Sequence, residues 1–358
     1  MTTVGIVGAG TMGAGIAQVI LAAGDEVILH DVDPAAIERA RERIAAGLER
    51  HPPAATPVAD ALGRLREATT LDALGAEAEV VLEAAIEDLD LKRTIVRALD
   101  AASGPSTILA TNTSALSVTA IAEAAARPER VLGLHWFNPV PRMDLVEVVR
   151  PPGVDASVVV RATDLVMGWG KTPVACGDTP GFIVNRVNRP YTIAALRLLE
   201  SRAASVEIID TALRDAGFPL GPFQLMDLIG LDVNLAAATA VWDGLGRPER
   251  LRPSTIQERL VAAGRLGRKT GRGFYRYEDG RAIGPDQPFA DGPRATLAEP
   301  AIAAIVINAI DDEARRAVTE GVATPDAIDL AMRLGANHPV GPFERRSVTD
   351  LRGSATTP

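Results

Sequence analysis

The sequence predicts an α/β fold in which a doubly wound, mainly parallel sheet is followed by an all-α domain. Three observations support this prediction. A glycine-rich turn joins an apolar strand to an apolar helix close to the N-terminus. Short apolar strands then alternate with helical segments up to about residue 180, and apolar residues beyond that point recur at helical spacing. Part of the helical segment is repeated near the C-terminus, which predicts an additional helical half-repeat.

The composition is that of an ordinary globular chain of 358 residues, with 47% hydrophobic and 23% charged residues. A net charge of −9 argues against a nucleic-acid-binding protein. The single cysteine, Cys176, excludes an intrachain disulfide and a cysteine-based metal cluster. No apolar run approaches the ~20 residues of a membrane span, and a first strand at Val4 leaves no room for a leader peptide, so we expect a cytoplasmic protein. The histidines are too scattered for a metal site: His30, His51, His135 and His338.

The N-terminal glycine pattern predicts a Rossmann-type dinucleotide site. Gly8 permits a tight turn, Gly10 lets a pyrophosphate approach the backbone, and Gly13 lets the following helix pack close to the strand. The next strand, residues 26–31, ends in Asp31, 18 positions after Gly13, close to the spacing of an acid that binds ribose hydroxyls. Its charge favours NAD over a cofactor with a 2′-phosphate. Asp33 is an alternative ribose acid, although Asp33-Pro34 has the pattern of a helix N-cap.

Two helical segments are expected between residues 34 and 71, on either side of the proline-rich turn 52–57. A buried strand follows at residues 80–85, and Glu87 and Lys92 come next, at the start of a helix on the edge where a cofactor binds. A further strand ends in the small polar residues 111–114. Their side chains have two possible uses, to cap the following helix or to bind a substrate oxygen.

The segment from His135 to Glu147 carries the candidate catalytic groups. Apolar strands are expected at residues 131–134 and 145–149, joined by a connection that Pro139 and Pro141 hold extended. Glu147 lies within an apolar strand, where a carboxylate is costly to bury without a partner. A histidine held by a carboxylate is a tunable general base, which predicts a His135–Glu147 pair. The alternative is that His135 ends a strand and Glu147 pairs with an arginine.

The turn at residues 177–181 indicates a domain boundary. We therefore predict a first domain at residues 1–180, a helical domain at 181–277, a linker at 278–300 and the half-repeat at 301–350. The repeat is visible in 209–223, which residues 328–343 echo. Arg186, near the start of the helical domain, is expected to form a structural ion pair.

The motifs together resemble the 3-hydroxyacyl-CoA dehydrogenase family, of the 3-hydroxybutyryl-CoA dehydrogenase type. The matching pieces follow the family's order and cover the chain to about Tyr277. They are Gly8–Gly13, Thr111–Ser114, His135–Glu147, Asp178–Arg186, Gly221–Gly230 and Arg268–Tyr275.

The resemblance implies NAD-dependent oxidation of a 3-hydroxyacyl-CoA to the 3-ketoacyl-CoA, or the reverse. It implies that His135 takes the proton of the 3-hydroxyl and that Glu147 orients the imidazole. Ser114, Asn138 and Asn185 would hold the hydroxyl and thioester oxygens. No metal is implied. The residues at or beside the family's cofactor contacts are Gly8, Gly10, Thr11, Met12, Gly13, Asp31, Glu87, Lys92 and Asn112.

One departure from the family lies in residues 49–53, where the helical hairpin is shortened and no lysine precedes Lys92. No contact with CoA is assigned there. This keeps a second hypothesis open, a dehydrogenase of a free β-hydroxy acid similar to gulonate 3-dehydrogenase. A third, a non-catalytic NAD-binding protein, has no use for a base and its carboxylate. The family pairs its helical domains across a homodimer, so the half-repeat predicts either a homodimer or a monomer that mimics the dimer within one chain.

Overall fold

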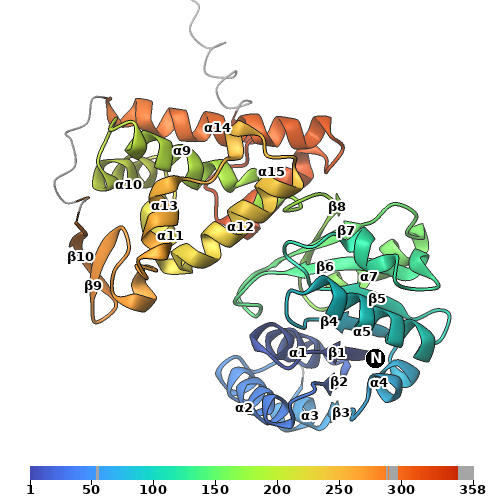
Figure 1. Ribbon diagram of the computed structural model, residues 1–358. Helices are drawn as coiled ribbons and strands as arrows, with labels where there is room; N and C mark the ends of the chain where they lie inside the picture. Colours follow the sequence, from blue (N-terminus) through green and yellow to red (C-terminus); the bar gives the residue numbers. More distant parts are fainter. Residues whose placement is uncertain (54–55, 288, 290–296, 346–358) are drawn as a thin grey trace, which may run out of the picture. The chain divides into compact units, whose positions relative to one another are not determined.

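The computed structural model describes residues 1–53, 56–287, 289 and 297–345. The chain divides into two compact units, Met1–Phe182 and Ile183–Pro358 (Figure 1). The first is an α/β unit and the second is almost entirely helical. The predicted fold class is therefore confirmed. Among the described residues no single helix is long and apolar enough to cross a membrane. Only together do the two helices Pro222–Ile229 and Leu231–Gly244, which meet at a sharp bend, have the required length and apolar composition.

The first unit is built on one eight-stranded sheet with the order β3-β2-β1-β4-β5-β6-β7-β8. Neighbouring strands are parallel except for β6 and β7, which are antiparallel. Helices cover both faces, because alternate residues of each strand point to opposite sides. In β1, Val4 and Ile6 belong to one apolar core and Val7 to the other. The strands are β1 Thr3–Val7, β2 Glu26–His30, β3 Leu65–Glu67, β4 Val80–Glu83, β5 Ile108–Thr111, β6 Val131–Trp136, β7 Leu145–Arg150 and β8 Thr172–Gly177.

Most helices of this unit begin at side-chain caps that the sequence supplies, such as Asp33, whose carboxylate accepts the N–H of Ala35. The first core contains residues of α1, α2 and α7, and the second contains residues of α4, α5 and α6. The helices are α1 Thr11–Ala23, α2 Pro34–Arg50, α3 Val58–Gly63, α4 Leu71–Glu77, α5 Leu89–Ala102, α6 Val118–Ala122, the short η1 Pro128–Arg130 and α7 Ala156–Gly168.

Three details differ from the prediction. The edge strand β3 was missed, since three residues are too few to produce a periodic signal. The connection after β6 is not extended: the Asn138–Pro139 peptide is cis, and the N–H groups of Arg142 and Met143 both donate to the Pro139 carbonyl. The expected linker 278–300 contains strand β10, Arg281–Pro285, which pairs with β9, Tyr275–Glu278. Residues 288 and 290–296 of that linker lie outside the described part.

The second unit consists of helices packed against one another, with the β9–β10 hairpin at its side (Figure 1). Its long helix α14 packs against α9 and α10. The helices are α8 Val184–Val187, α9 Arg189–Glu200, α10 Val206–Asp215, α11 Pro222–Ile229, α12 Leu231–Gly244, η2 Glu249–Leu251, α13 Thr255–Ala262, η3 Arg268–Thr270, α14 Glu299–Thr319 and α15 Pro325–Ala336.

The half-repeat reproduces the hydrogen bonds of the first copy. The carboxylate of Asp210 accepts the backbone N–H groups of Phe223 and Gln224, at 2.9 and 3.1 Å. That of Asp329 accepts those of Phe343 and Glu344, at 2.8 and 3.1 Å. The repeated sequence thus folds into a repeated structure. The exact domain limits stay a prediction.

Candidate active site

A chain of hydrogen bonds links Ser114, His135 and Glu147. The antiparallel register of β6 and β7 places His135 directly opposite Glu147. Imidazole Nδ1 lies 2.6 Å from Oε2 of Glu147, and Nε2 lies 2.9 Å from Oγ of Ser114. With Nδ1 donating its hydrogen to the carboxylate, Nε2 is left with a lone pair. The arrangement has the chemistry of a general base that a carboxylate orients.

Apolar surroundings isolate this pair from water. Glu147 is 0% and His135 3% exposed, and the rings of Phe137 and Phe182 lie 4.5 and 5.5 Å from the imidazole. Burial and then the nearby carboxylate of Glu147 raise the pKa of the Cys176 thiol well above its ordinary value. Cys176 is therefore held as a neutral thiol and is no nucleophile. The expected His135–Glu147 pair is confirmed.

Glu87 organises the loop that carries Ser114. One of its carboxylate oxygens accepts hydrogen bonds from Thr113 Oγ1 at 2.5 Å, from the N–H of Ser114 at 2.9 Å and from that of Ala115 at 3.0 Å. These bonds fix the backbone from which the Ser114 hydroxyl reaches His135. Glu87 was predicted as a cofactor contact, and that role stays a prediction.

Lys92 and Glu83 form a buried ion pair behind this loop. Lys92 is 0% and Glu83 1% exposed, and Nζ lies 2.7 and 2.9 Å from the two carboxylate oxygens. Nζ also lies 3.6 Å from Glu87. Sequence reasoning missed Glu83, although it is an acid in an apolar strand, the same signal that identified Glu147. The predicted cofactor role of Lys92 remains untested by these contacts.

The amide of Asn112 connects two strand ends. Its side-chain Oδ1 accepts the N–H of Trp136 at 2.9 Å, and the backbone N–H of Asn112 donates to the Glu83 carbonyl at 2.7 Å. Asn112 therefore fixes the backbone immediately after His135. Its predicted place beside the cofactor stays a prediction.

Lys171 stabilises the loop that bears Asn138. Asn138 itself is exposed. The Lys171 ammonium donates to the carbonyls of Val140 and Met143, at 2.9 and 2.8 Å, and burial lowers its pKa. Asn185, the last predicted substrate contact, belongs to helix α8 of the second unit. The roles of Asn138 and Asn185 towards a substrate stay predictions.

The opening glycines have the geometry that a bound dinucleotide requires. Gly8 has a φ of +102°, and a Cβ there would lie 2.6 Å from the Ala84 carbonyl oxygen. A Cβ on Gly13 would lie 1.8 Å from the Gly8 oxygen, so the helix packs this close to the turn only because the residue is glycine. A Cβ on Gly10 would meet nothing within 4 Å, which leaves the backbone open to a ligand.

The acid predicted to bind ribose is held by the same turn. Oδ2 of Asp31 accepts the N–H of Ala9 at 2.7 Å, and Oδ1 accepts that of Asp33 at 2.9 Å. Asp33 itself caps α2, as its sequence pattern predicted. Val32 and Ile86, which follow β2 and β4, are 94% and 73% exposed and offer apolar surface beside the turn. Thr11 and Met12 form the open N-terminus of α1, so these residues fit NAD.

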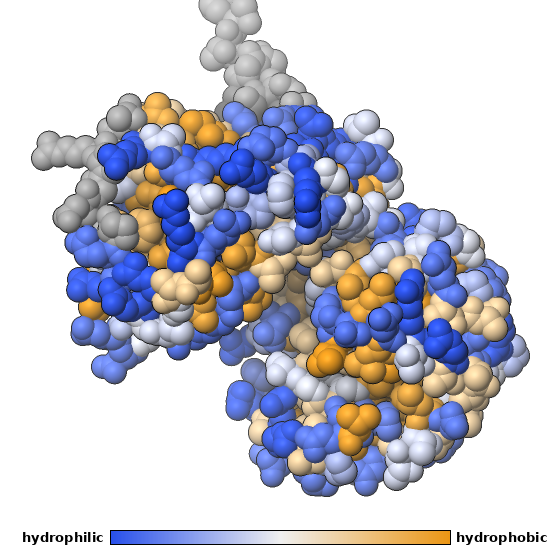
Figure 2. Space-filling model, in the orientation of Figure 1, coloured by the Kyte–Doolittle hydropathy of each residue, from blue (hydrophilic) through white to orange (hydrophobic). Residues whose placement is uncertain are grey.

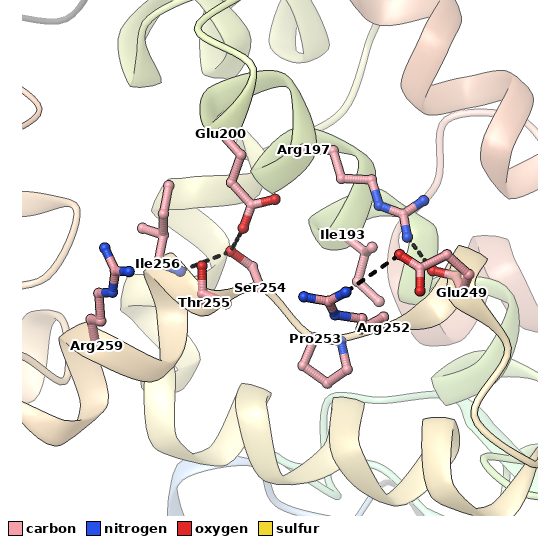
Figure 3. A pocket seen from close by; sticks show the side chains of 10 residues that line it. All are labelled: Ile193, Arg197, Glu200, Glu249, Arg252, Pro253, Ser254, Thr255, Ile256 and Arg259. Carbon is pink, nitrogen blue, oxygen red and sulfur yellow. Dashed lines mark hydrogen bonds and ion pairs between the residues drawn. The ribbon is translucent and has the colours of Figure 1, made fainter.

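The described residues hold no group of three or more potential metal ligands. The second unit does contain a hollow of about 460 Å³ between α9 and α13, lined by three arginines (Figure 3). Several of its polar groups bind one another: Ser254 donates to Glu200, Arg252 pairs with Glu249, and Arg197 donates to the Glu249 carbonyl. None of the predicted site residues lines it. On the face shown in Figure 2 the apolar side chains form separate patches among hydrophilic ones.

Two family models match the chain. The model described as 3-hydroxyacyl-CoA dehydrogenase, NAD binding domain, matches residues 3–179. The model described as 3-hydroxyacyl-CoA dehydrogenase, C-terminal domain, matches residues 181–277 and 302–355. The second match therefore includes both the helical domain and the half-repeat.

Individual proteins of known name are also similar to this chain in sequence or in structure. The 3-hydroxyadipyl-CoA dehydrogenase of Escherichia coli (strain K12) is 48% identical over 278 residues, 76% of this chain and 58% of that protein. The mitochondrial hydroxyacyl-coenzyme A dehydrogenase of Rattus norvegicus is 41% identical over 284 residues, 76% of this chain and 90% of its own. The crystal structure of 3-hydroxybutyryl-CoA dehydrogenase from E. coli K12 matches with a TM-score of 0.86 and 37% identity, covering 95% of this chain and 90% of that one.

Proposed function

Because this chain belongs to the 3-hydroxyacyl-CoA dehydrogenase family, we propose that it is an NAD-dependent enzyme in which His135 is the general base. The reaction is the oxidation of a 3-hydroxyacyl-CoA to the 3-ketoacyl-CoA, or its reverse. The observation that carries the proposal is the chain of hydrogen bonds that runs from Ser114 to the buried pair of His135 and Glu147. A protein that only binds NAD has no need for it.

Bound NAD supplies the acceptor for the hydride that leaves C3 of the substrate. As that bond breaks, the proton of the 3-hydroxyl becomes acidic, and Nε2 of His135 takes it. Glu147 then stabilises the imidazolium, because its carboxylate already lies 2.6 Å from Nδ1. The surrounding phenylalanines exclude water, which strengthens this electrostatic stabilisation.

The hydroxyl of Ser114 occupies the position beside Nε2 at 2.9 Å. We propose that it binds the substrate hydroxyl and keeps that oxygen within reach of the imidazole. Glu87 supports this role, since it fixes the backbone N–H of Ser114. Asn138 and Asn185 are proposed to hold the substrate oxygens, as the family resemblance implies.

Formation of NADH tests the reaction and separates it from oxidation of a free β-hydroxy acid. The purified chain is given NAD with 3-hydroxybutyryl-CoA in one assay and with free 3-hydroxybutyrate in another. We expect turnover of the thioester and at least tenfold lower kcat/KM for the free acid. Preference for the free acid would establish the second hypothesis, and absence of turnover with both would contradict an enzymatic role. A cytoplasmic location stays a prediction.

The half-repeat has a proposed role in association. Phe218 and His338 precede the equivalent prolines of the two copies, and their rings touch edge to face, with centroids 5.0 Å apart. Contact between equivalent residues is typical of an interface with twofold symmetry. We therefore propose that the half-repeat covers the face of the helical domain that a second subunit would bury, and that the chain is a monomer.

Size-exclusion chromatography with light scattering tests this proposal on the full chain and on a chain ending at Tyr277. The full chain is expected to be monomeric. The shorter chain is expected to self-associate, because α9 and α10 lose the cover of α14. The same association state for both chains would contradict the proposal.

A further inference from the structure

The five residues Asp178–Phe182 follow β8 and end the first unit, and we call them the boundary segment. The N–H of Phe182 donates to the Thr179 carbonyl at 2.9 Å, which closes the segment into a turn. The N–H of Asp178 donates to the carbonyl of Arg150, at the end of β7, at 3.3 Å. The segment is thus attached to the sheet, and its first and last side chains contact two other parts of the same unit.

Asp178 joins the boundary segment to the helix that follows the Ser114 loop. Its Oδ2 accepts the hydroxyls of Ser117 and Thr119 at 2.8 and 2.6 Å, and the N–H of Thr119 at 2.7 Å. Ser117 is the N-cap of α6 and lies three residues after Ser114. Because the first N–H groups of a helix need an acceptor outside it, Asp178 fixes the point at which the Ser114 loop enters α6.

Phe182 joins the other end of the boundary segment to the imidazole of His135. The two ring centroids lie 5.5 Å apart, and the ring planes are tilted by 60°. Phe182 is only 2% exposed. Aromatic rings at this distance favour a tilted arrangement over a face-to-face one. Together with the bond from Nδ1 to Glu147, this contact restricts the rotation of the imidazole.

The backbone of Phe182 is strained. Its φ of +49° lies in the left-handed region, which residues with a Cβ rarely adopt. Gly181, one residue earlier, has a φ of +80° without this cost, so a glycine at position 182 would also suit the turn. Strained residues persist where the surrounding structure over-determines them, and they cluster at active sites. The contact of the Phe182 ring with His135 is therefore a reason for a large side chain at this position.

We propose that Phe182 and Asp178 are positioning residues for the proton transfer. The turn between them holds the His135 imidazole and the Ser114 loop in place relative to each other, so that Nε2 stays within reach of the substrate hydroxyl. This inference rests on the proposed dehydrogenase function and adds two residues to it. Phe182 acts through His135, and Asp178 acts through the Ser114 loop. Their loss should lower kcat and leave NAD affinity unchanged, since a misplacement of about 1 Å can cost about 100-fold in rate.

Phe182→Ala is expected to lower kcat about 10- to 100-fold with an unchanged Kd for NAD, as steady-state kinetics with 3-hydroxybutyryl-CoA and titration with NAD measure. Phe182→Leu, which keeps an apolar side chain but loses the ring, should lie between Phe182→Ala and the unaltered enzyme. Phe223→Ala is the matched control, because Phe223 is 0% exposed and belongs to α11 of the second unit. It removes the same side chain from a core and should keep kcat within about threefold. The Tm of each variant shows that the assays contain folded protein.

Combined variants separate positioning from a general loss of structure. In a His135→Gln background, Phe182→Ala should lower kcat by less than about twofold, because the group through which it acts is already gone. Asp178→Ala should lower kcat about tenfold by itself and by less than about twofold in a Ser114→Ala background. A kcat for Phe182→Ala equal to that of Phe223→Ala, or equal losses with and without the background substitution, would overturn the proposal and leave the dehydrogenase function intact. Absence of turnover by the unaltered enzyme would instead contradict the proposed function.

Discussion

At the scale of single residues, two glutamates in apolar strands hold the side chains of the candidate active site and of the elements beside it. Glu83 ends β4 and Glu147 lies within β7, and both are at most 1% exposed. A buried carboxylate requires a donor, and each has one at 2.6 to 2.7 Å: Lys92 for Glu83 and His135 for Glu147. The donor to Glu147 is an imidazole, the side chain that most often serves as a general base.

His135→Gln is expected to lower kcat by roughly 10²–10⁴, because glutamine cannot accept the hydroxyl proton. NAD affinity should be retained, since the glycine turn and Asp31 are untouched. Steady-state kinetics and titration with NAD measure the two quantities. Near-normal turnover would remove His135 from the mechanism.

His51→Gln is a suitable control, because this exposed histidine follows α2 and should keep normal kcat. A double variant, His135→Gln with Glu147→Gln, extends the comparison. Since Glu147 acts through the imidazole, the double variant should lose little more activity than His135→Gln alone. Independent, multiplicative losses would count against the pair acting as a unit.

At the scale of elements, strand β4 and helix α5 are joined by the Glu83–Lys92 pair. Thr111 of β5 also donates to Glu83, at 2.6 Å, so one buried carboxylate ties three neighbouring elements together. Glu87 lies two residues before α5 and accepts the backbone N–H of Ser114. The buried pair therefore supports the elements beside the loop that carries Ser114.

Lys92→Met is expected to destabilise the first unit by about 3–5 kcal/mol, since it leaves Glu83 buried without its cation. The double variant Glu83→Gln with Lys92→Met should recover part of this loss. Urea unfolding followed by circular dichroism measures both. An exposed pair, Arg161 with Glu79, gives the control: Arg161→Met should cost less than about 1 kcal/mol. Equal costs for the two single variants would contradict the importance of burial.

At the scale of the whole molecule, the half-repeat is joined to the helical domain by buried polar contacts. Arg186 pairs with Glu313 of α14 at 2.9 Å, with both side chains at most 1% exposed, so the expected structural ion pair of Arg186 is confirmed. Nε2 of His338 lies 2.9 Å from Oδ1 of Asn188. These contacts make the C-terminal addition part of one helical core.

Acid should destabilise this core through His338. Burial, with a smaller contribution from Arg345, lowers the pKa of His338 to about 3, whereas the unfolded chain has the ordinary value near 6.5. The unfolded state therefore binds the proton first as the pH falls below 6.5, and the stabilisation is lost over that range. Between pH 7 and 5 the loss attributable to His338 is about 2 kcal/mol.

His338→Gln keeps a donor for Asn188 and removes the titration. Its free energy of unfolding should fall by about 2 kcal/mol less than that of the unaltered chain between pH 7 and 5, as denaturant unfolding at the two pH values measures. His51→Gln should change nothing, because His51 is exposed. An unchanged pH dependence in His338→Gln would contradict a buried neutral imidazole.

The sequence by itself determined the alternation of strands and helices in the first unit, the helical character of the second, the glycine turn and the identity of the His135–Glu147 pair. These features depend on local patterns: apolar periodicity, residues that permit a tight turn, and acids in strands that are otherwise apolar. The half-repeat was visible for the same reason, since the two copies share short sequences.

Only the tertiary structure decided which side chains meet. Two examples are the pairing of Lys92 with Glu83 and the contact of Glu87 with the Ser114 backbone. Both depend on residues brought together from separate elements. The three-residue strand β3 likewise exists because β2 offers it a partner edge. A single sequence gives the cost of burying a charge, but the partner that offsets this cost is set by packing, because side chains distant in sequence supply it.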